Sequence, residues 1–465
     1  MVDNSRRSTI HSLFMTQPAP ERLISLDVFR GMTIAGMVLV NNPGTSPVYW
    51  PLDHAEWNGL TPTDWIFPFF LFIVGVSISI SLGRRKEQGV TARTYLQIIT
   101  RAASIYLLGA AVSILPFFQF QASDPTDPLK MLVWLVFAAA LFFLLLRNYK
   151  VAGVLAGVGV LGIVAFNLGG YNVVPYNFAT WRIAGVLQRI SVCYLLASLV
   201  FLHMSWRRQL VLSVALLLLY WALMTLVPIP GCDITSMNDK ACNVAAYVDR
   251  MIITEPHMWR VAKVYDPEGI LSTIPAIVTT ISGILTGLWL RTRPAPGVDD
   301  GDVEAPTVEV SENEFRLGKV AGMFFFGVVL LGLGLIWNSY FPMNKSLWTS
   351  SYVLATTGLA LLILGACYWL IDIKGYAKWA WPFRVFGANA LALFVFTGLF
   401  ARMITAYRVT GDDGQLVSVQ RWVMQHVYLP IAQPIDASWM FALSFILLWL
   451  FLMWLLYRRQ IYVKV

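Results

Sequence analysis

Long apolar windows alternate with short polar segments along almost the whole chain. Because a helix rises 1.5 Å per residue, a window of about 20 apolar residues crosses the roughly 30 Å of hydrocarbon in a bilayer. The pattern therefore predicts an all-α polytopic integral membrane protein. About twelve spans are expected, near residues 26–42, 62–82, 94–117, 129–147, 151–168, 181–203, 209–227, 269–290, 318–337, 348–370, 384–404 and 437–457.

The windows at 129–147 and 151–168 are short and are joined only by residues 147–150. Two such helices form a tight hairpin, which can be gained or lost as a pair without changing the rest of the topology. The other ten spans are therefore expected to form the basic bundle. The hairpin is an addition to it.

The polar segments divide the chain into parts. Two loops, 41–64 and 228–268, are rich in Trp, Tyr, His, Pro and acidic residues, and we expect function to lie there. An acidic segment with Pro and Gly predicts a disordered linker, and the polar N-terminus has no apolar segment typical of a cleavable signal peptide. The predicted parts are a cytoplasmic tail (1–22), an N-terminal transmembrane half (23–293), a cytoplasmic linker (294–314) and a C-terminal transmembrane half (315–465).

Composition and charge narrow the class of protein. Hydrophobic residues make up 57% of the chain and charged residues only 13%, which excludes an ordinary soluble enzyme. The net charge of +8 is scattered singly between spans, so no nucleic-acid partner is predicted. Of 34 Lys and Arg residues, 23 lie at the loops of one side, 10 at the other and one within a span. The positive-inside rule then predicts both termini in the cytoplasm.

Cysteine and glycine give two weaker signals. Cys232 and Cys242 share one non-cytoplasmic loop, and a disulfide between them is predicted, with two free thiols as the alternative. The four cysteines are too scattered for a zinc site, and no metal is predicted. Gly157, Gly159 and Gly162 match the spacing of a dinucleotide-binding loop. They lie inside an apolar span, however, so the spacing favours helix packing.

One loop gathers polar and aromatic residues that could perform chemistry. His54 lies in it, with Trp50 and Trp57 nearby and Asn41 at the end of the preceding span. An imidazole can remove a proton at neutral pH, which makes His54 a candidate general base. The alternative is an aromatic belt at the membrane surface with incidental polar residues.

Acidic residues stand just before two spans. Thr61 followed by Asp64 forms a capping-box pattern, and Asp266 and Glu268 repeat the pattern before the span at 269–290. Capping explains each acid taken singly. Because all of them fall on the same membrane face as His54, they are also candidates for holding a cationic substrate.

Four further polar residues lie in or beside spans. Asp27 and Arg30 are one helical turn apart in the first span, and Gln188 and Arg189 lie within the sixth. Ionisable groups in a membrane are costly and indicate a functional site facing the bundle interior. A purely structural Asp–Arg pair is the alternative.

Six motifs occur in a consistent order from about residue 22 to the C-terminus. They are Leu26-Asp27-Val28-Phe29-Arg30-Gly31, Val40-Asn41, His54-Ala55-Glu56-Trp57-Asn58-Gly59-Leu60-Thr61 with Asp64 and Phe67-Pro68, Gly185-Val186-Leu187-Gln188-Arg189, Tyr265-Asp266-Pro267-Glu268-Gly269, and Asn344-Lys345-Ser346-Leu347-Trp348. Together they resemble the heparan-alpha-glucosaminide N-acetyltransferase family of transmembrane acyltransferases, and its bacterial, NagX-like members most of all.

The resemblance implies a function and a place for it. Members of this family take acetyl-CoA from the cytoplasmic side and acetylate the amine of a terminal glucosamine on the other side, with a histidine and an asparagine that match His54 and Asn41. The lysosomal members carry a luminal domain and an additional leading helix that this chain lacks, and they lack the hairpin near 129–168. A small periplasmic amino sugar is therefore the expected acceptor, and the inner membrane of a bacterium the expected location. Whether the chain forms a homodimer stays open.

The expected roles follow from this reaction. His54 removes a proton from the amine, and the Asn41 amide donates a hydrogen bond to the oxyanion or fixes the imidazole tautomer. The substrate-binding candidates are Asp64, Trp50, Trp57, Glu268 and Asp266, and the acetyl-CoA-binding candidates are Asp27, Arg30, Gln188 and Arg189.

The length of the first helix suits this donor. Asp27 and Asn41 are separated by about 21 Å of helix, comparable to an extended pantetheine arm. Twelve spans with buried charges also fit a sugar or proton-coupled transporter, although we find no internal repeat that would favour one.

Overall fold

The computed structural model describes residues 23–232, 236–292 and 311–463, and this part of the chain is almost entirely helical. Eleven helices in it are long and apolar enough to cross a membrane, and a bent helix pair makes a twelfth span. The predicted class, an all-α multi-pass membrane protein of about twelve spans, is confirmed. The placing of both termini in the cytoplasm stays a prediction, so we call the side with more Lys and Arg the basic side and the other the opposite side.

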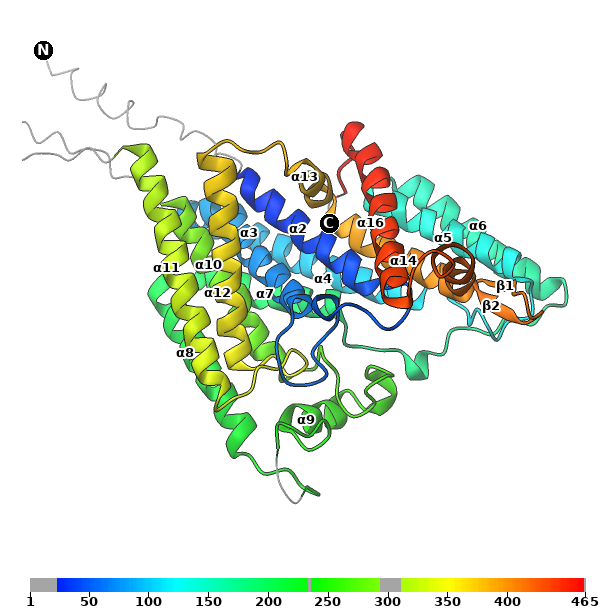
Figure 1. Cartoon of the computed structure of the whole chain (residues 1–465), viewed down its shortest axis with the longest axis horizontal. Helices are drawn as coiled ribbons and strands as arrows, with labels where there is room; N and C mark the ends of the chain where they lie inside the picture. Colours follow the sequence, from blue (N-terminus) through cyan, green and yellow to red (C-terminus); the bar gives the residue numbers. More distant parts are fainter. Residues whose placement is uncertain (1–22, 233–235, 293–310, 464–465) are drawn as a thin grey trace, which may run out of the picture.

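The long helices pack into a bundle (Figure 1). They are α2 (Ile24–Asn41), α3 (Ile66–Gln88), α4 (Ala92–Ile114), α5 (Asp127–Leu145), α6 (Tyr149–Leu168), α7 (Val186–His203), α8 (Trp206–Leu226), α10 (Thr273–Arg291), α11 (Glu312–Asn338), α12 (Ser350–Cys367), α14 (Ala390–Ala406) and α16 (Pro434–Arg458). The bundle is roughly triangular in outline, with α11 and α12 at one side and α5 and α6 at the other (Figure 1). Helix α12 runs on into a π-helical turn, η5 (Tyr368–Ile373).

The shorter elements lie in the connecting segments. They are α13 (Trp381–Ala388), α9 (Val244–Ile252), α15 (Val419–Val423), the strands β1 (Arg408–Thr410) and β2 (Leu416–Ser418), and the turns η1 (Trp50–Leu52), η2 (Pro62–Trp65), η3 (Phe178–Thr180), η4 (Glu255–His257) and η6 (Met424–Tyr428). The two strands form a small antiparallel hairpin that the sequence pattern did not reveal.

Helix α3 crosses the centre of the bundle because glycine allows its neighbour to come very close. A Cβ added at Gly75 would lie 1.9 Å from the carbonyl oxygen of Thr280 in α10. In the same way, a Cβ at Gly31 of α2 would lie 1.7 Å from the carbonyl oxygen of Phe383 in α13. These contacts hold α3 against α10 and α2 against α13, and the second of them joins the two predicted halves of the chain.

The span predicted as one helix over 384–404 is broken. Helices α13 and α14 meet at an angle of 83° on either side of Asn389. The side chain of Asn389 bonds the C-terminal segment at the break, donating to the Ile461 carbonyl at 2.9 Å and accepting from the Val463 amide at 2.8 Å. These partners lie more than 70 residues away in the sequence, so the local apolar pattern could not reveal the break and predicted a continuous helix.

The hairpin of α5 and α6 packs through α5. The Gly159 and Gly162 positions of α6 lie against Phe137 and Val133 of α5, whereas an added Cβ at Gly157 would meet open space. The glycine spacing therefore serves helix packing at two of its three positions.

Two predicted parts lie wholly or partly outside the described residues. The tail 1–22 is one, and the linker 294–314 is described only from residue 311 onward. Ser311 and Glu314 form a capping box at the start of α11, so the last residues predicted as linker belong to a helix.

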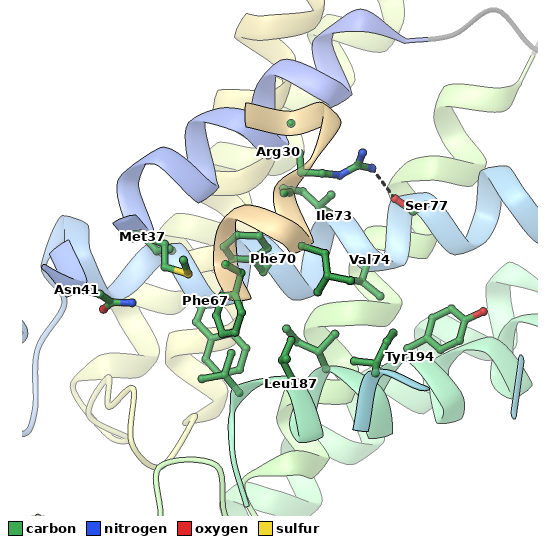
Figure 2. Close-up of a pocket in the computed structure, with 18 of the residues that line it drawn as sticks. Arg30, Met37, Asn41, Phe67, Phe70, Ile73, Val74, Ser77, Leu187 and Tyr194 are labelled. Atoms are coloured by element: carbon green, nitrogen blue, oxygen red, sulfur yellow. Dashed lines mark hydrogen bonds between the residues drawn. The ribbon is translucent and has the colours of Figure 1, made fainter. Parts of the chain in front are cut away.

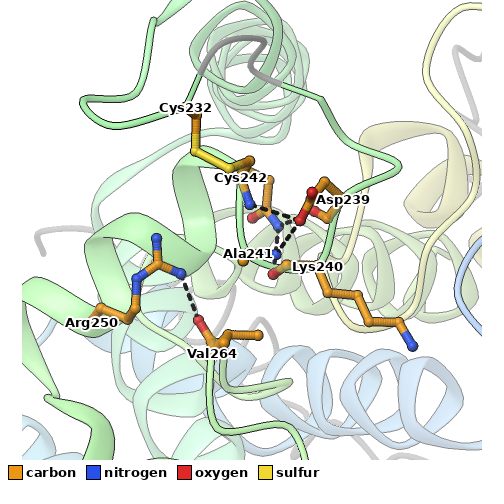
Figure 3. The surroundings of a disulfide bond; sticks show 8 residues. Cys232, Asp239, Lys240, Ala241, Cys242, Arg250 and Val264 are labelled. Carbon is orange, nitrogen blue, oxygen red and sulfur yellow. Dashed lines mark hydrogen bonds between the residues drawn. A yellow bond between two sulfur atoms is a disulfide. The ribbon is translucent and has the colours of Figure 1, made fainter.

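The long loop on the opposite side is ordered by α9 and by a disulfide. The structure joins Cys232 to Cys242, and the Asp239 carboxylate accepts hydrogen bonds from the amides of Ala241 and Cys242 (Figure 3). Those two bonds lower the pKa of Asp239. The Arg250 guanidinium of α9 donates to the Val264 carbonyl at 2.9 Å and thereby ties α9 to the segment before α10.

Candidate active site

A cavity of about 610 Å³ runs lengthwise through the bundle beside α3. Its walls come from α2, α3, α4, α7 and the break between α13 and α14 (Figure 2). Residues of α3 line it from Ile66 to Ser81, a stretch of about 22 Å at 1.5 Å per residue. The cavity therefore extends through most of the roughly 30 Å of hydrocarbon.

The two ends of the cavity are polar and its middle is apolar. Asn41, His54, Glu268 and Lys345 line the end on the opposite side, whereas Arg147 and, deeper in the bundle, Arg30 and Arg101 line the part toward the basic side. Between them the wall is made by Phe67, Phe70, Ile73, Val74, Leu187, Ile190, Leu391 and Phe394.

The polar end of the cavity on the opposite side is organised around a His–Asp pair. The Nδ1 atom of His54 lies 2.7 Å from Oδ1 of Asp64. An ionised carboxylate only accepts, so Nδ1 carries the proton and Nε2 keeps its lone pair. With 48% of its side chain exposed, His54 can reach a substrate. This arrangement leaves Nε2 available as a base.

The Asp64 carboxylate is 1% exposed and is fully occupied by neighbours. Its Oδ2 accepts from the Ala55 amide at 3.2 Å, the Thr61 amide at 3.1 Å and the Thr61 hydroxyl at 3.0 Å. The capping box predicted from Thr61 and Asp64 is present. Asp64 has no access to a substrate ammonium, so the role expected from the sequence is replaced by that of orienting His54.

Lys345 is a third member of this group, and sequence reasoning gave it no role. Its Nζ lies 3.0 Å from Nδ1 and 3.1 Å from Nε2 of His54, and 3.7 Å from Oδ1 of Asp64. Near-equal distances to both ring nitrogens place the ammonium over the imidazole face. Burial lowers the pKa of Lys345, while the charges of Asp64 and Glu268 oppose that shift. The signal that could have found it is its place in the motif of residues 344–348. The structure brings this motif to the His54 loop, where the Asn344 amide donates to the side chain of Asn58.

Asn41 ends α2 and points toward the cavity (Figure 2). Its side-chain amide makes no hydrogen bond within the residues that the structure describes. The next residue differs, because Asn42 is buried and donates to the Val38 carbonyl at 2.7 Å. Asn41 is therefore the asparagine whose amide remains available at this end.

The sequence pattern suggested that the two acids before α10 cap that helix. In the structure they do not. Arg182 binds both of them, Asp266 at 2.6 Å and 3.0 Å and Glu268 through a close ion pair. Burial acts to lower the pKa of Arg182, but the two carboxylates outweigh it and raise that pKa above its ordinary value. Asp266 is buried and does not line the cavity. Glu268 does line it.

The two tryptophans do not lie where a sugar platform was expected. Trp57 donates to the Met237 carbonyl at 2.8 Å and packs edge-on against Tyr265, so it fastens the loop. Trp50 is 67% exposed. Neither side chain lines the cavity.

Only one of the four residues expected to bind acetyl-CoA lines the cavity. Arg30 donates hydrogen bonds to Ser77 at 3.1 Å and to Asp27 at 3.3 Å. Arg30 and Ser77 face the cavity, whereas Asp27 does not line it (Figure 2). Gln188 and Arg189 are buried on the other side of α7. Arg189 donates to the Gly269 carbonyl at 3.0 Å and lies 5.2 Å from the ring centre of Trp348, so it anchors the loop before α10.

Comparisons with known proteins point to one family. Residues 22–163 match the family described as "Heparan-alpha-glucosaminide N-acetyltransferase, catalytic". The chain is 28% identical over 410 residues to the human protein named heparan-alpha-glucosaminide N-acetyltransferase, and 26% identical over 399 residues to the mouse protein of that name. These matches cover 81% and 80% of this chain but 52% and 53% of the relatives, so the chain spans about half their length. The family resemblance found in the six motifs is confirmed.

Proposed function

We propose, from the chain's similarity to the heparan-alpha-glucosaminide N-acetyltransferase family, that it is an acetyl-CoA-dependent transmembrane N-acetyltransferase. The acetyl group comes from acetyl-CoA on the basic side, which we take to be the cytoplasm. It is transferred to the amine of a glucosamine-type sugar on the opposite side, which is the periplasm of a bacterial inner membrane. The observation that carries this proposal is the continuous cavity between Arg30 at one end and His54 at the other.

The reaction uses the groups at the His54 end. The amine attacks the thioester carbonyl, a C–N bond forms and the C–S bond breaks. Nε2 of His54 accepts the proton lost by the amine and returns it to the departing thiolate of CoA. Asn41 donates a hydrogen bond to the oxyanion formed on the way, a contribution typically worth about 3 kcal/mol. Glu268 attracts the sugar amine toward the cavity.

The cavity suits a thioester carried on a long arm. Arg30 and Asn41, both on its wall, are separated by about 16 Å of helix. An extended pantetheine arm can cover such a distance through the apolar middle, with its nucleotide held at the basic side. The acetyl group then crosses the membrane region while the nucleotide stays near the basic end.

One experiment tests the proposal directly. Purified full-length protein in detergent is incubated with labelled acetyl-CoA and a panel of amino sugars, and both free CoA and labelled amide are measured. Stoichiometric release of CoA and formation of amide are expected with a glucosamine-type acceptor. Uptake of the sugar into proteoliposomes without consumption of the thioester would favour a transporter instead.

Replacing Lys345 with Gln should lower kcat for acetyl transfer by about tenfold. The ammonium lies 3.7 Å from the buried Asp64 carboxylate that orients His54, and a neutral amide removes this charge pairing. Steady-state measurement of kcat, and of KM for both substrates, in the two proteins gives the change.

The matched control is Lys240→Gln. Lys240 lies on the same side of the bundle, over the Trp57 ring at 5.7 Å, and does not line the cavity. Its kcat should coincide with that of the parent. An unchanged kcat in Lys345→Gln would show that the ammonium does not act on the His54–Asp64 pair.

A further inference from the structure

The basic end of the cavity carries a concentration of positive charge that the proposed function leaves partly unexplained. Arg101 from α4 and Arg147 from the turn after α5 line this end together with Arg30. Among the lining residues of the described chain, the one acid is Glu268, which belongs to the other end. Ser77 and Ser81 of α3 add two hydroxyl groups beside the three guanidinium groups.

Arg147 occupies a backbone position where glycine is the usual choice. Its φ is +61°, in the left-handed region, and its amide and that of Asn148 donate to the Leu144 and Phe143 carbonyls to close the end of α5. Glycine adopts this conformation without steric cost, whereas a residue with a side chain pays for it. An arginine here therefore calls for a role for its guanidinium. Within the described ranges that group forms no ion pair with Asp or Glu.

Arg101 gives an independent indication. It lies about 14 Å along α4 from the first residue of that helix, at a depth where a guanidinium is costly unless it faces a polar space. Its guanidinium lies 5.2 Å from the ring centre of Tyr194, which also lines the cavity. In the part of the chain that the structure covers, no carboxylate forms an ion pair with it.

We propose that Arg101 and Arg147, with Arg30, form a phosphate-binding rim, so that the α5–α6 hairpin belongs to the donor site. The proposal rests on the proposed function for the identity of the ligand, the phosphate groups of coenzyme A. Guanidinium groups match phosphate by paired, charge-assisted hydrogen bonds. The headgroup of an anionic lipid offers the same chemistry and is the other source to be distinguished.

The packing of α5 holds Arg147 in place. Leu141 and Leu145 of α5 are buried in the same cluster as Leu187 of α7 and Val395 of α14. The Phe142 ring also meets that of Phe396 at 5.6 Å between ring centres. The hairpin is thus fixed to two helices that form the cavity wall, which keeps its arginine at the rim.

The test measures binding to the purified full-length protein in nanodiscs of zwitterionic lipid. CoA, 3′-dephospho-CoA and pantetheine are titrated into the parent, Arg147→Gly, Arg147→Gln, Arg101→Gln and Lys150→Gln. Arg147→Gly removes the charge and relieves the left-handed backbone, so loss of folding cannot explain its effect. Lys150→Gln is the matched control, because Lys150 carries the same charge three residues further on and does not line the cavity.

Each of the three arginine variants should lower the affinity for CoA relative to pantetheine by about tenfold to a hundredfold. Lys150→Gln should stay within about twofold of the parent. An unchanged affinity ratio in the Arg147 variants, or a parent that binds no CoA, overturns the proposal. So does an effect of Arg147 on binding of anionic lipid, measured in a second set of nanodiscs that contain such lipid, without an effect on CoA.

Acetyl transfer is measured separately, so the two proposals can fail independently. If the parent transfers acetyl groups but the Arg147 variants bind CoA as tightly as the parent does, the phosphate-binding rim alone is refuted. Arg147-dependent binding of CoA by a parent that transfers no acetyl group refutes the proposed function and leaves the rim in place.

Discussion

His54→Ala should lower kcat for acetyl transfer by about 10²-fold to 10⁴-fold, the range that a positioned general base contributes. Nδ1 is engaged by Asp64 at 2.7 Å, so Nε2, which lies 3.1 Å from the Lys345 ammonium, is the nitrogen left to accept a proton. The base acts in the transition state and not in binding of the donor. The affinity for CoA should therefore change little, and both quantities can be measured on the same purified protein.

His426→Ala serves as the control for this substitution. His426 lies on the opposite side beyond the cavity, stacked on Trp422 and bonded to Asp412 at 3.1 Å. Its removal should leave kcat within about twofold of the parent. A His54→Ala protein that keeps kcat within tenfold would refute the assignment of the base and return a transporter to consideration.

Asp64→Asn should reduce kcat by about 10²-fold to 10⁴-fold, as much as His54→Ala, without unfolding the protein. The amide oxygen of the new side chain can still accept from the Ala55 and Thr61 amides, so its NH₂ group must face Nδ1 of His54. Nδ1 then becomes the acceptor and the imidazole proton moves to Nε2. A ring protonated at Nε2 cannot remove a proton from the amine. Steady-state kinetics should show the loss in kcat with KM for acetyl-CoA nearly unchanged.

Asp53→Asn is the neighbouring control. Asp53 is exposed and accepts a hydrogen bond from the backbone amide of His54 at 2.8 Å, which an asparagine can also do. This variant should keep kcat within about threefold. Loss of thermal stability in Asp64→Asn, or a rise in KM equal to the fall in kcat, would indicate damage to the loop instead of a change of tautomer.

Hydropathy was sufficient for the number and type of the spans, because a membrane helix must satisfy its backbone internally and present apolar side chains along some 20 residues. The capping box of Thr61 and Asp64 was also readable, since it involves residues three apart. The break between α13 and α14 could not be predicted from the sequence. It depends on Asn389 bonding residues near the C-terminus.

For the candidate site, the sequence by itself placed His54 and Asn41 and drew attention to Asp64 and Glu268. It could not assign which acid orients the histidine, because that depends on which carboxylate the loop turns inward. Only the tertiary structure brought Lys345 over His54 from 291 residues away. It also turned Arg189 toward the loop before α10 and placed Arg101 and Arg147 in the wall of the same cavity as Arg30. Local patterns fix which segments cross the membrane, since that is a matter of solvation along one helix. Which side chains share a cavity is decided by the rotation and packing of helices that are distant in the chain.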